Sequence, residues 1–171
     1  DRNIEENKGA SLMRVSVLAV GRCDPLLVKA LDHYEASAKH YWKLQVREIS
    51  NGVSRSKKIR PDEVKKQEAE RLMSMIPARA KVTALSRSGR KTSSVGLSEY
   101  LQECALGSIS DVVFVIGGAF GLSEVVLQRA NHVMALSALT YTHGFARVIL
   151  LEQIYRAGTI MRNEPYHKGA V

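Results

Sequence analysis

Short apolar segments alternate with helical patterns along this chain. Residues 111–116 (DVVFVI) are almost wholly apolar and β-branched, which is typical of a strand buried on both faces of a sheet. Apolar side chains at every second position of 42–49 predict a half-buried strand. Three more strands are predicted at 12–20, 81–86 and 133–136, where apolar runs end at or just before glycine or serine.

Apolar residues at helical spacing fill the intervals between these strands. Asp24 and Pro25 can cap and open the first helix. The remaining helices are predicted at 61–76, at 94–104 with Ser94 as its cap, at 123–130, and from Thr142 or His143 to 161. This alternation is typical of an α/β fold with a mostly parallel sheet flanked by helices. A length of 171 residues fits one domain, assigned to 12–168, with 1–11 as a flexible N-terminal extension.

The last predicted helix has apolar residues around most of its circumference. A helix on the surface of one domain has a narrower apolar stripe. This helix is therefore expected to be buried on two sides, either deep in one core or between two subunits.

Positive charge is concentrated in one part of the chain. The whole protein has a formal net charge of +8, and residues 55–91 contain twelve Lys and Arg against four acidic residues. That segment therefore accounts for the whole excess. A basic surface on a neutral body favours a phosphate backbone as partner, and the alternative is a solvated face that aids solubility.

Several classes of protein do not fit the composition. The two cysteines, Cys23 and Cys104, provide no disulfide framework and no metal-ligand spacing, so a reducing compartment and no metal are expected. No apolar run is long enough for a membrane-spanning helix.

Candidate ligand-binding residues follow the strands, because ligands of open parallel sheets bind beyond the carboxyl ends of the strands. The relevant loops are 86–91, 117–122 and 137–143. Gly117 and Gly118 let the backbone approach a ligand without a Cβ in the way, and Gly121 allows a tight turn. The pattern GGxxG differs from the dinucleotide motif GxGxxG, and no acidic residue follows about twenty positions later, so a NAD site is disfavoured.

Three motifs in 114–168 are similar to those of one known family. The segments IGGAFGLS, LSALTYTHGFARVILLEQIYRA and NEPYHK resemble the RlmH family, SPOUT-class methyltransferases that modify a pseudouridine of large-subunit ribosomal RNA. The opening MRVSVLAVG and the segment ALSRSGR are also similar to that family. The resemblance covers 13–168. It implies an α/β domain with a deep trefoil knot in its C-terminal part, and a homodimer that acts on the helix 69 loop of assembled ribosomes.

The resemblance also implies S-adenosylmethionine as cofactor. The positions that correspond to its binding site are Leu85, Gly117, Gly118, Gly121, Ser137, Ala138, Leu139, Thr140, Tyr141 and Thr142. The family has Leu-Pro where this chain has Tyr141-Thr142, so the adenine pocket is expected to differ in detail.

Four residues are candidates for the chemistry of methyl transfer. A uracil-type ring nitrogen carries a proton, so the reaction needs a base or a group that stabilises the developing anion. Histidine suits this role because its unperturbed pKa is about 6.5, and the candidates are His143 and His167. Tyr166 can stack on or hydrogen-bond the base. Arg147 can bind a phosphate or the anion, and its structural alternative is an ion pair with Glu152 or Glu124.

The RNA-binding candidates are cations near the predicted ligand edge and in the tail. They are Arg55, Lys57, Lys58, Arg60, Arg87, Arg90, Lys91 and Lys168. Two alternatives stay open, namely the same fold acting on a different RNA nucleotide, and a non-catalytic RNA-binding dimer. The expected compartment is a bacterial cytoplasm, with an organelle matrix or plastid as alternative.

Overall fold

The computed structural model describes residues 13–51 and 60–169. In these ranges five strands form one sheet in the order β2-β1-β4-β3-β5, and every paired strand is parallel to its neighbour. The elements are β1 (Arg14–Val20), η1 (Pro25–Leu27), α2 (Val28–Ala38), β2 (Lys43–Ile49), α3 (Pro61–Met75), β3 (Lys81–Lys91), α4 (Ser94–Leu106), β4 (Asp111–Ile116), α5 (Glu124–Arg129), β5 (His132–Ala135), α6 (His143–Met161) and η2 (Pro165–Gly169). The predicted α/β fold with a parallel sheet is confirmed.

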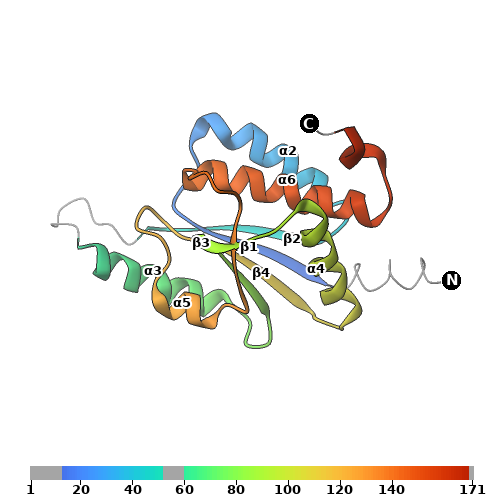
Figure 1. Cartoon of the computed structure of the whole chain (residues 1–171). Helices are drawn as coiled ribbons and strands as arrows, with labels where there is room; N and C mark the ends of the chain where they lie inside the picture. The colour runs from blue at the N-terminus through green and yellow to red at the C-terminus, as the bar shows by residue number, and fades with distance from the viewer. Residues whose placement is uncertain (1–12, 52–59, 170–171) are drawn as a thin grey trace.

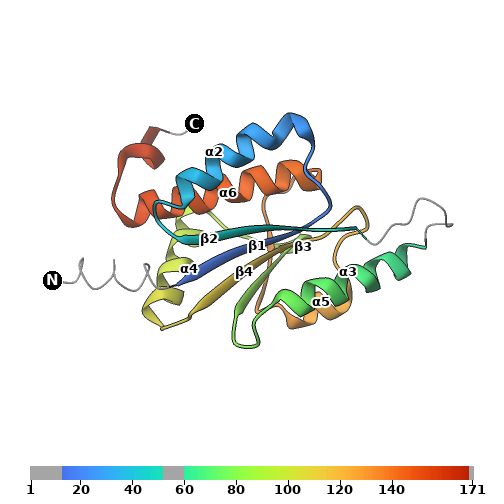
Figure 2. The same ribbon diagram turned by 180° about the vertical axis from the view of Figure 1, so that it is seen from behind.

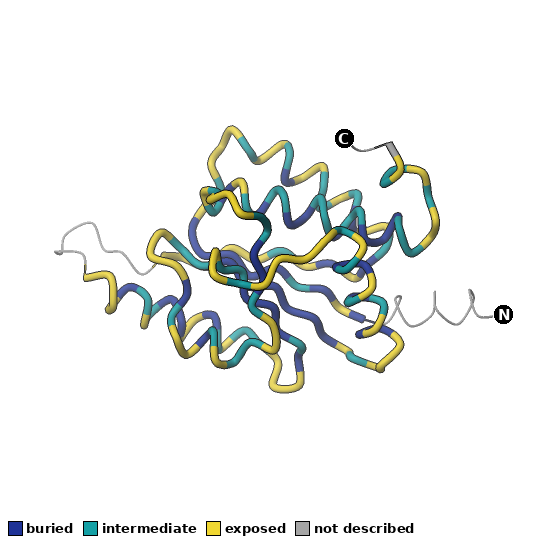
Figure 3. The backbone as a smooth tube through the Cα atoms, in the orientation of Figure 1, coloured by how far each residue is buried: buried dark blue, intermediate teal, exposed yellow. Residues whose placement is uncertain are grey.

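Helices cover both faces of the sheet. Figures 1 and 2 show α2 and α6 side by side over one face, with α4 beside them, and α3 and α5 on the opposite face. β4 lies between β1 and β3 and all six of its residues are buried, as its apolar sequence predicts. The strands accordingly form the buried centre of the molecule in Figure 3.

The alternation of side chains along the strands divides the core in two. Val15 and Val17 of β1 pack toward α2, α4 and α6, whereas Leu18 and Val20 pack toward α3 and α5. Both clusters are apolar, so the sheet is held from both sides.

The two-sided burial of α6 is achieved inside one chain. This helix packs against α2 and α4 as well as against the sheet, and Leu150, Leu151 and Ile154 have no exposed surface. Trp42 is buried beside it and donates a 3.0 Å hydrogen bond from Nε1 to the carbonyl of Ile154. Of the two alternatives for α6, burial in one core is thus observed.

β3 is longer than its sequence predicts. The segment 87–94 is polar and contains glycine, which predicts a loop, but β3 continues to Lys91. Leu85 and Arg90 both pair with Met134 of β5, so residues 86–89 leave the ladder and return to it. Gly89 permits this path because a Cβ there would lie 2.5 Å from the Met134 carbonyl carbon.

The predicted cap of α4 is displaced by one residue. The hydroxyl of Ser93, rather than that of Ser94, accepts a 3.0 Å hydrogen bond from the Gly96 backbone N–H. Ser94 instead donates a 2.6 Å hydrogen bond to Gln153 of α6. The side chain that was expected to cap the helix therefore joins α4 to α6.

Gly158→Ala tests the packing between α6 and the segment that precedes β2. A Cβ at this position would lie 2.3 Å from Cγ of Tyr41. We expect the substitution to lower the free energy of unfolding by about 1–3 kcal/mol through this overlap, despite a gain in helix propensity of about 1 kcal/mol. Urea denaturation measures the change, and an unchanged or higher stability would contradict the packing described.

Candidate functional site

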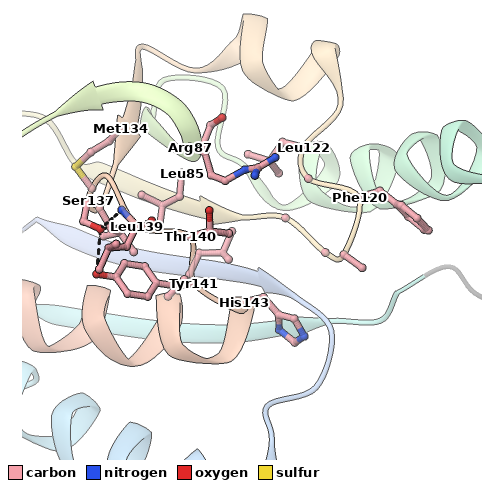
Figure 4. A pocket seen from close by; sticks show the side chains of 18 of the residues that line it. Leu85, Arg87, Phe120, Leu122, Met134, Ser137, Leu139, Thr140, Tyr141 and His143 are labelled. Carbon is pink, nitrogen blue, oxygen red and sulfur yellow. Dashed lines mark hydrogen bonds between the residues drawn. The ribbon is translucent and has the colours of Figure 1, made fainter.

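A cavity of about 600 Å³ lies at the carboxyl ends of β3, β4 and β5. Its wall is formed by Leu85–Arg87 of β3, by Ile116–Leu122 after β4 and by residues of the loop that joins β5 to α6. Figure 4 shows Leu139, Thr140 and Tyr141 from the last of these loops, together with Leu85, Arg87 and Leu122. All three loops selected from the sequence thus contribute to one cavity of the size that small-molecule cofactors occupy.

The glycine turn after β4 brings bare backbone to the cavity. Gly121 has φ +75°, and its N–H donates a 3.0 Å hydrogen bond to the carbonyl of Gly118. A Cβ on Gly117 would lie 2.8 Å from the Gly121 carbonyl carbon, so the turn closes only without a side chain there. Backbone groups can therefore contact a ligand directly.

The loop before α6 is held by a serine. The Ser137 hydroxyl accepts a 2.8 Å hydrogen bond from the Leu139 N–H and donates a 3.0 Å bond to the Tyr141 hydroxyl. The dashed lines in Figure 4 mark these contacts. Leu139 is 70% exposed although it lines the cavity, so an apolar surface is available to a ligand.

Most of the cofactor-binding residues predicted from the sequence line this cavity. They are Leu85, Gly117, Gly118, Gly121, Ser137, Leu139, Thr140 and Tyr141. Ala138 and Thr142 do not line it, and Thr142 instead accepts a capping hydrogen bond from the Phe145 N–H at the start of α6. Sequence reasoning missed the apolar lining formed by Ile116, Leu127, Met134 and Leu136, because apolar residues of strands and helices resemble ordinary core.

His143 lines the cavity from the first residue of α6. Its ring lies against Gly21, where a Cβ would be 3.3 Å from the imidazole Cε1. Gly21 has φ +89°, a conformation that a larger residue rarely adopts. The Nδ1 atom of His143 is buried and has no hydrogen-bond partner within the described ranges.

Arg147, one turn after His143, is buried beneath the cavity edge and does not line the cavity. Its guanidinium donates a 2.6 Å hydrogen bond to Glu48 and a 2.9 Å bond to the carbonyl of Gly21. Only 1% of its side chain is exposed. The structural alternative of an ion pair was named with the wrong partner, because β2 brings Glu48 rather than Glu152 or Glu124 to this position, and Glu152 pairs with Arg156.

The tail residues Tyr166 and His167 do not line the cavity. The Tyr166 hydroxyl donates a 2.9 Å hydrogen bond to Glu152, and the Arg156 guanidinium lies 4.6 Å from its ring centroid. Burial and the bond to Glu152 raise the pKa of Tyr166. Since Glu152 is nine residues after His143, the tail contacts α6 about 14 Å along the helix axis from the cavity.

Comparison with known proteins decides the family. A family model described as "Predicted SPOUT methyltransferase" matches residues 13–167. This chain belongs to the SPOUT methyltransferase family. Its RlmH branch, which the sequence motifs indicated, is also confirmed by curated relatives named "Ribosomal RNA large subunit methyltransferase H".

Two of these relatives are similar over their whole length. The protein of Gemmatimonas aurantiaca is 43% identical over 157 residues, covering 91% of this chain and 100% of the relative. That of Syntrophotalea carbinolica is 40% identical over 156 residues, covering 91% and 99%. A solved methylase family protein from Neisseria gonorrhoeae matches with a TM-score of 0.51 at 12% identity, over 84% of this chain and 82% of that one, which supports the fold alone.

SPOUT methyltransferases use S-adenosylmethionine, and the cavity of this SPOUT chain suits that donor. Apolar side chains such as Leu85 and Leu139 can pack on the faces of an adenine ring, and the glycine turn offers backbone groups to polar atoms. No cluster of metal-binding side chains occurs within 13–51 and 60–169. In the same ranges no helix combines the length and apolarity needed to cross a membrane.

The predicted RNA-binding cations fall into three groups. Arg87 lines the cavity. Arg60, Arg90, Lys91 and Lys168 are exposed. Arg55, Lys57 and Lys58 lie outside the described residues.

Glu48→Gln tests the ion pair beneath the cavity. Although burial raises the pKa of Glu48, the Cys23 N–H and the Arg147 guanidinium lower it by more, so the net pKa is below its ordinary value. The pair therefore stabilises the fold at pH values above the ordinary glutamate pKa of about 4.3, and this contribution is lost as the pH falls through the lower folded value. The Glu48 side chain is 47% exposed, so solvent screens the pair, and we expect the variant to lose about 1 kcal/mol of unfolding free energy at pH 7.

The difference between the wild type and Glu48→Gln should shrink as the pH falls below about 4. Denaturation at pH 7, 5 and 3 measures it. Glu35→Gln is the control, since the Glu35–Lys39 pair is a surface i,i+4 pair that contributes about 0.5 kcal/mol or less. A pH-independent loss, or a loss no larger than that of the control, would show that the charge of Glu48 is immaterial.

Proposed function

We propose that this chain methylates a ring nitrogen of a pseudouridine in the helix 69 loop of large-subunit ribosomal RNA, within assembled ribosomes. The observation that carries the proposal is the glycine-walled cavity of about 600 Å³ in a chain of the RlmH family, with a histidine at its edge. The name of these relatives supports large-subunit ribosomal RNA as the substrate. Their bacterial sources support a bacterial cytoplasm as the compartment.

S-adenosylmethionine, when bound, supplies an electrophilic methyl group. The residues suited to hold it are the glycine turn, Leu85 and the loop from Ser137 to Tyr141. A fixed arrangement of donor and acceptor contributes about 7–11 kcal/mol to such a reaction when the geometry is good. The chain therefore acts first by positioning.

The acceptor nitrogen must lose its proton before or during methyl transfer. His143 is suited to this step, because it lines the cavity and histidine side chains commonly serve as general bases. Arg147 is occupied by Glu48 and Gly21, so we assign it no direct contact with the acceptor.

The chain works as a homodimer in this proposal. Apolar side chains beside the start of α6 are exposed: Leu26 at 88%, Val28 at 41% and Phe145 at 52%. Such a patch is suited to a protein interface. A second subunit would also give the tail a role in catalysis. Tyr166 and His167 fold onto the middle of α6, away from the cavity of their own chain, so they could contact only the cavity of a partner. The tail of one subunit then completes the site of the other.

The trefoil knot that the resemblance implies also remains part of the proposal. It is supported by the match of residues 13–167 to the SPOUT family model.

Mass mapping of ribosomal RNA tests the proposed substrate. Ribosomes from a strain without this activity are incubated with the protein and S-adenosylmethionine, beside isolated large subunits and free RNA. We expect one added methyl group on a pseudouridine of the helix 69 fragment, in assembled ribosomes only. A methyl group elsewhere, or none in the presence of bound donor, would refute the assignment.

Mixed dimers test the shared site. One chain lacks residues 164–171, and the other carries Gly117→Val, which places a side chain where a Cβ already lies 2.8 Å from Gly121. Each homodimer is expected to be inactive, whereas a mixed dimer of the two chains has about half of the wild-type activity, because one complete site forms from a cavity and a tail of different chains. An inactive mixture of folded, dimeric chains would contradict the shared site.

A further inference from the structure

Glu68 is a buried carboxylate that the proposed mechanism does not use. It lies on α3, on the face of the helix that packs against the sheet, and only 4% of the residue is exposed. Burial raises its pKa, while the N–H of Gly118 and the charge of Arg71 act in the opposite direction. A carboxylate kept in such a place costs free energy unless it has partners.

The partner of Glu68 is the glycine turn of the donor cavity. The N–H of Gly118 lies close enough to the carboxylate to lower its pKa. A Cβ on Gly118 would lie 2.8 Å from one carboxylate oxygen and 3.2 Å from the other, so the carboxylate packs directly on this residue. The carbonyl of Gly118 is held by the Gly121 N–H at 3.0 Å. The Glu68 carboxylate on one side and the Gly121 N–H on the other therefore fix the position of Gly118.

The position of α3 is itself fixed near Glu68. Arg71, one turn later, donates hydrogen bonds of 2.7 and 2.8 Å to the carbonyl and hydroxyl of Ser50, which follows β2. One turn of α3 thus contacts both the segment after β4 and the segment after β2, which lie on either side of β1. Figure 1 shows α3 on the face of the sheet opposite α6, so these contacts hold the turn from the α3 face of the sheet.

We propose that Glu68 is a positioning residue for donor binding. Its carboxylate holds Gly118 so that the turn 117–121 presents its backbone to S-adenosylmethionine. The residue touches the turn and acts through it, without lining the cavity. This inference rests on the donor-binding part of the proposed function and is independent of which RNA nucleotide is methylated.

Calorimetry with S-adenosylmethionine tests the inference on the full chain. Glu68→Asp keeps the charge but withdraws the carboxylate by one methylene from Gly118, and we expect it to weaken donor binding about 5- to 10-fold, an effect of the size of one lost polar contact. Glu68→Gln keeps an acceptor oxygen at the same reach and should stay within about 2-fold of the wild type. Glu70→Asp, at an exposed position of the same helix, is the matched control and should not change the affinity.

The outcomes separate this inference from a mere effect on folding. Thermal melts accompany each titration and report the stability of each variant. A donor affinity that falls in Glu68→Asp but not in Glu68→Gln is the result expected of a residue that positions the turn through an acceptor oxygen. An affinity of Glu68→Asp equal to that of the wild type, or a loss in Glu68→Gln as large as that in Glu68→Asp, would overturn the inference. Failure to methylate ribosomal RNA by a wild type that binds the donor would instead concern the proposed substrate.

Discussion

The site depends on the parallel pairing of β4 between β1 and β3. Because all five strands run in the same direction, their carboxyl ends meet at one edge of the sheet. The register of β4 against both neighbours places the glycine turn after Ile116 beside Leu85 and close to the loop after β5. A cavity then forms from segments that are far apart in the sequence, and apolar burial on both faces of β4 keeps it in place.

A second constraint is the charge buried beneath His143. Arg147 joins α6 to the ends of β1 and β2 through Gly21 and Glu48, and Gly21 lies against the imidazole. Removing Glu48 would leave the guanidinium charge of Arg147 buried with one partner fewer. The histidine is therefore oriented by a network that α6, β1 and β2 build together, and α6 cannot shift without breaking it.

The fold and much of the cavity could be predicted from the sequence, because both follow from local pattern. The apolar run of β4, the glycines after it and the caps of the helices are local signals. The path of residues 86–89 around Met134 could not be predicted, since it depends on contact between two strands distant in sequence. The same holds for Arg147, whose ion-pair partner was predicted wrongly, and for Glu68, which was not predicted at all. Each side chain contacts a group that only tertiary packing brings to it.

The central claim is that this cavity holds the methyl donor. A crystal structure of the protein with S-adenosylmethionine tests it most directly. The account predicts density for the donor between the glycine turn 117–121 and the loop 137–141, with Leu85 against the adenine. Density at another place, or a cavity that stays empty when calorimetry shows full occupancy, would contradict it.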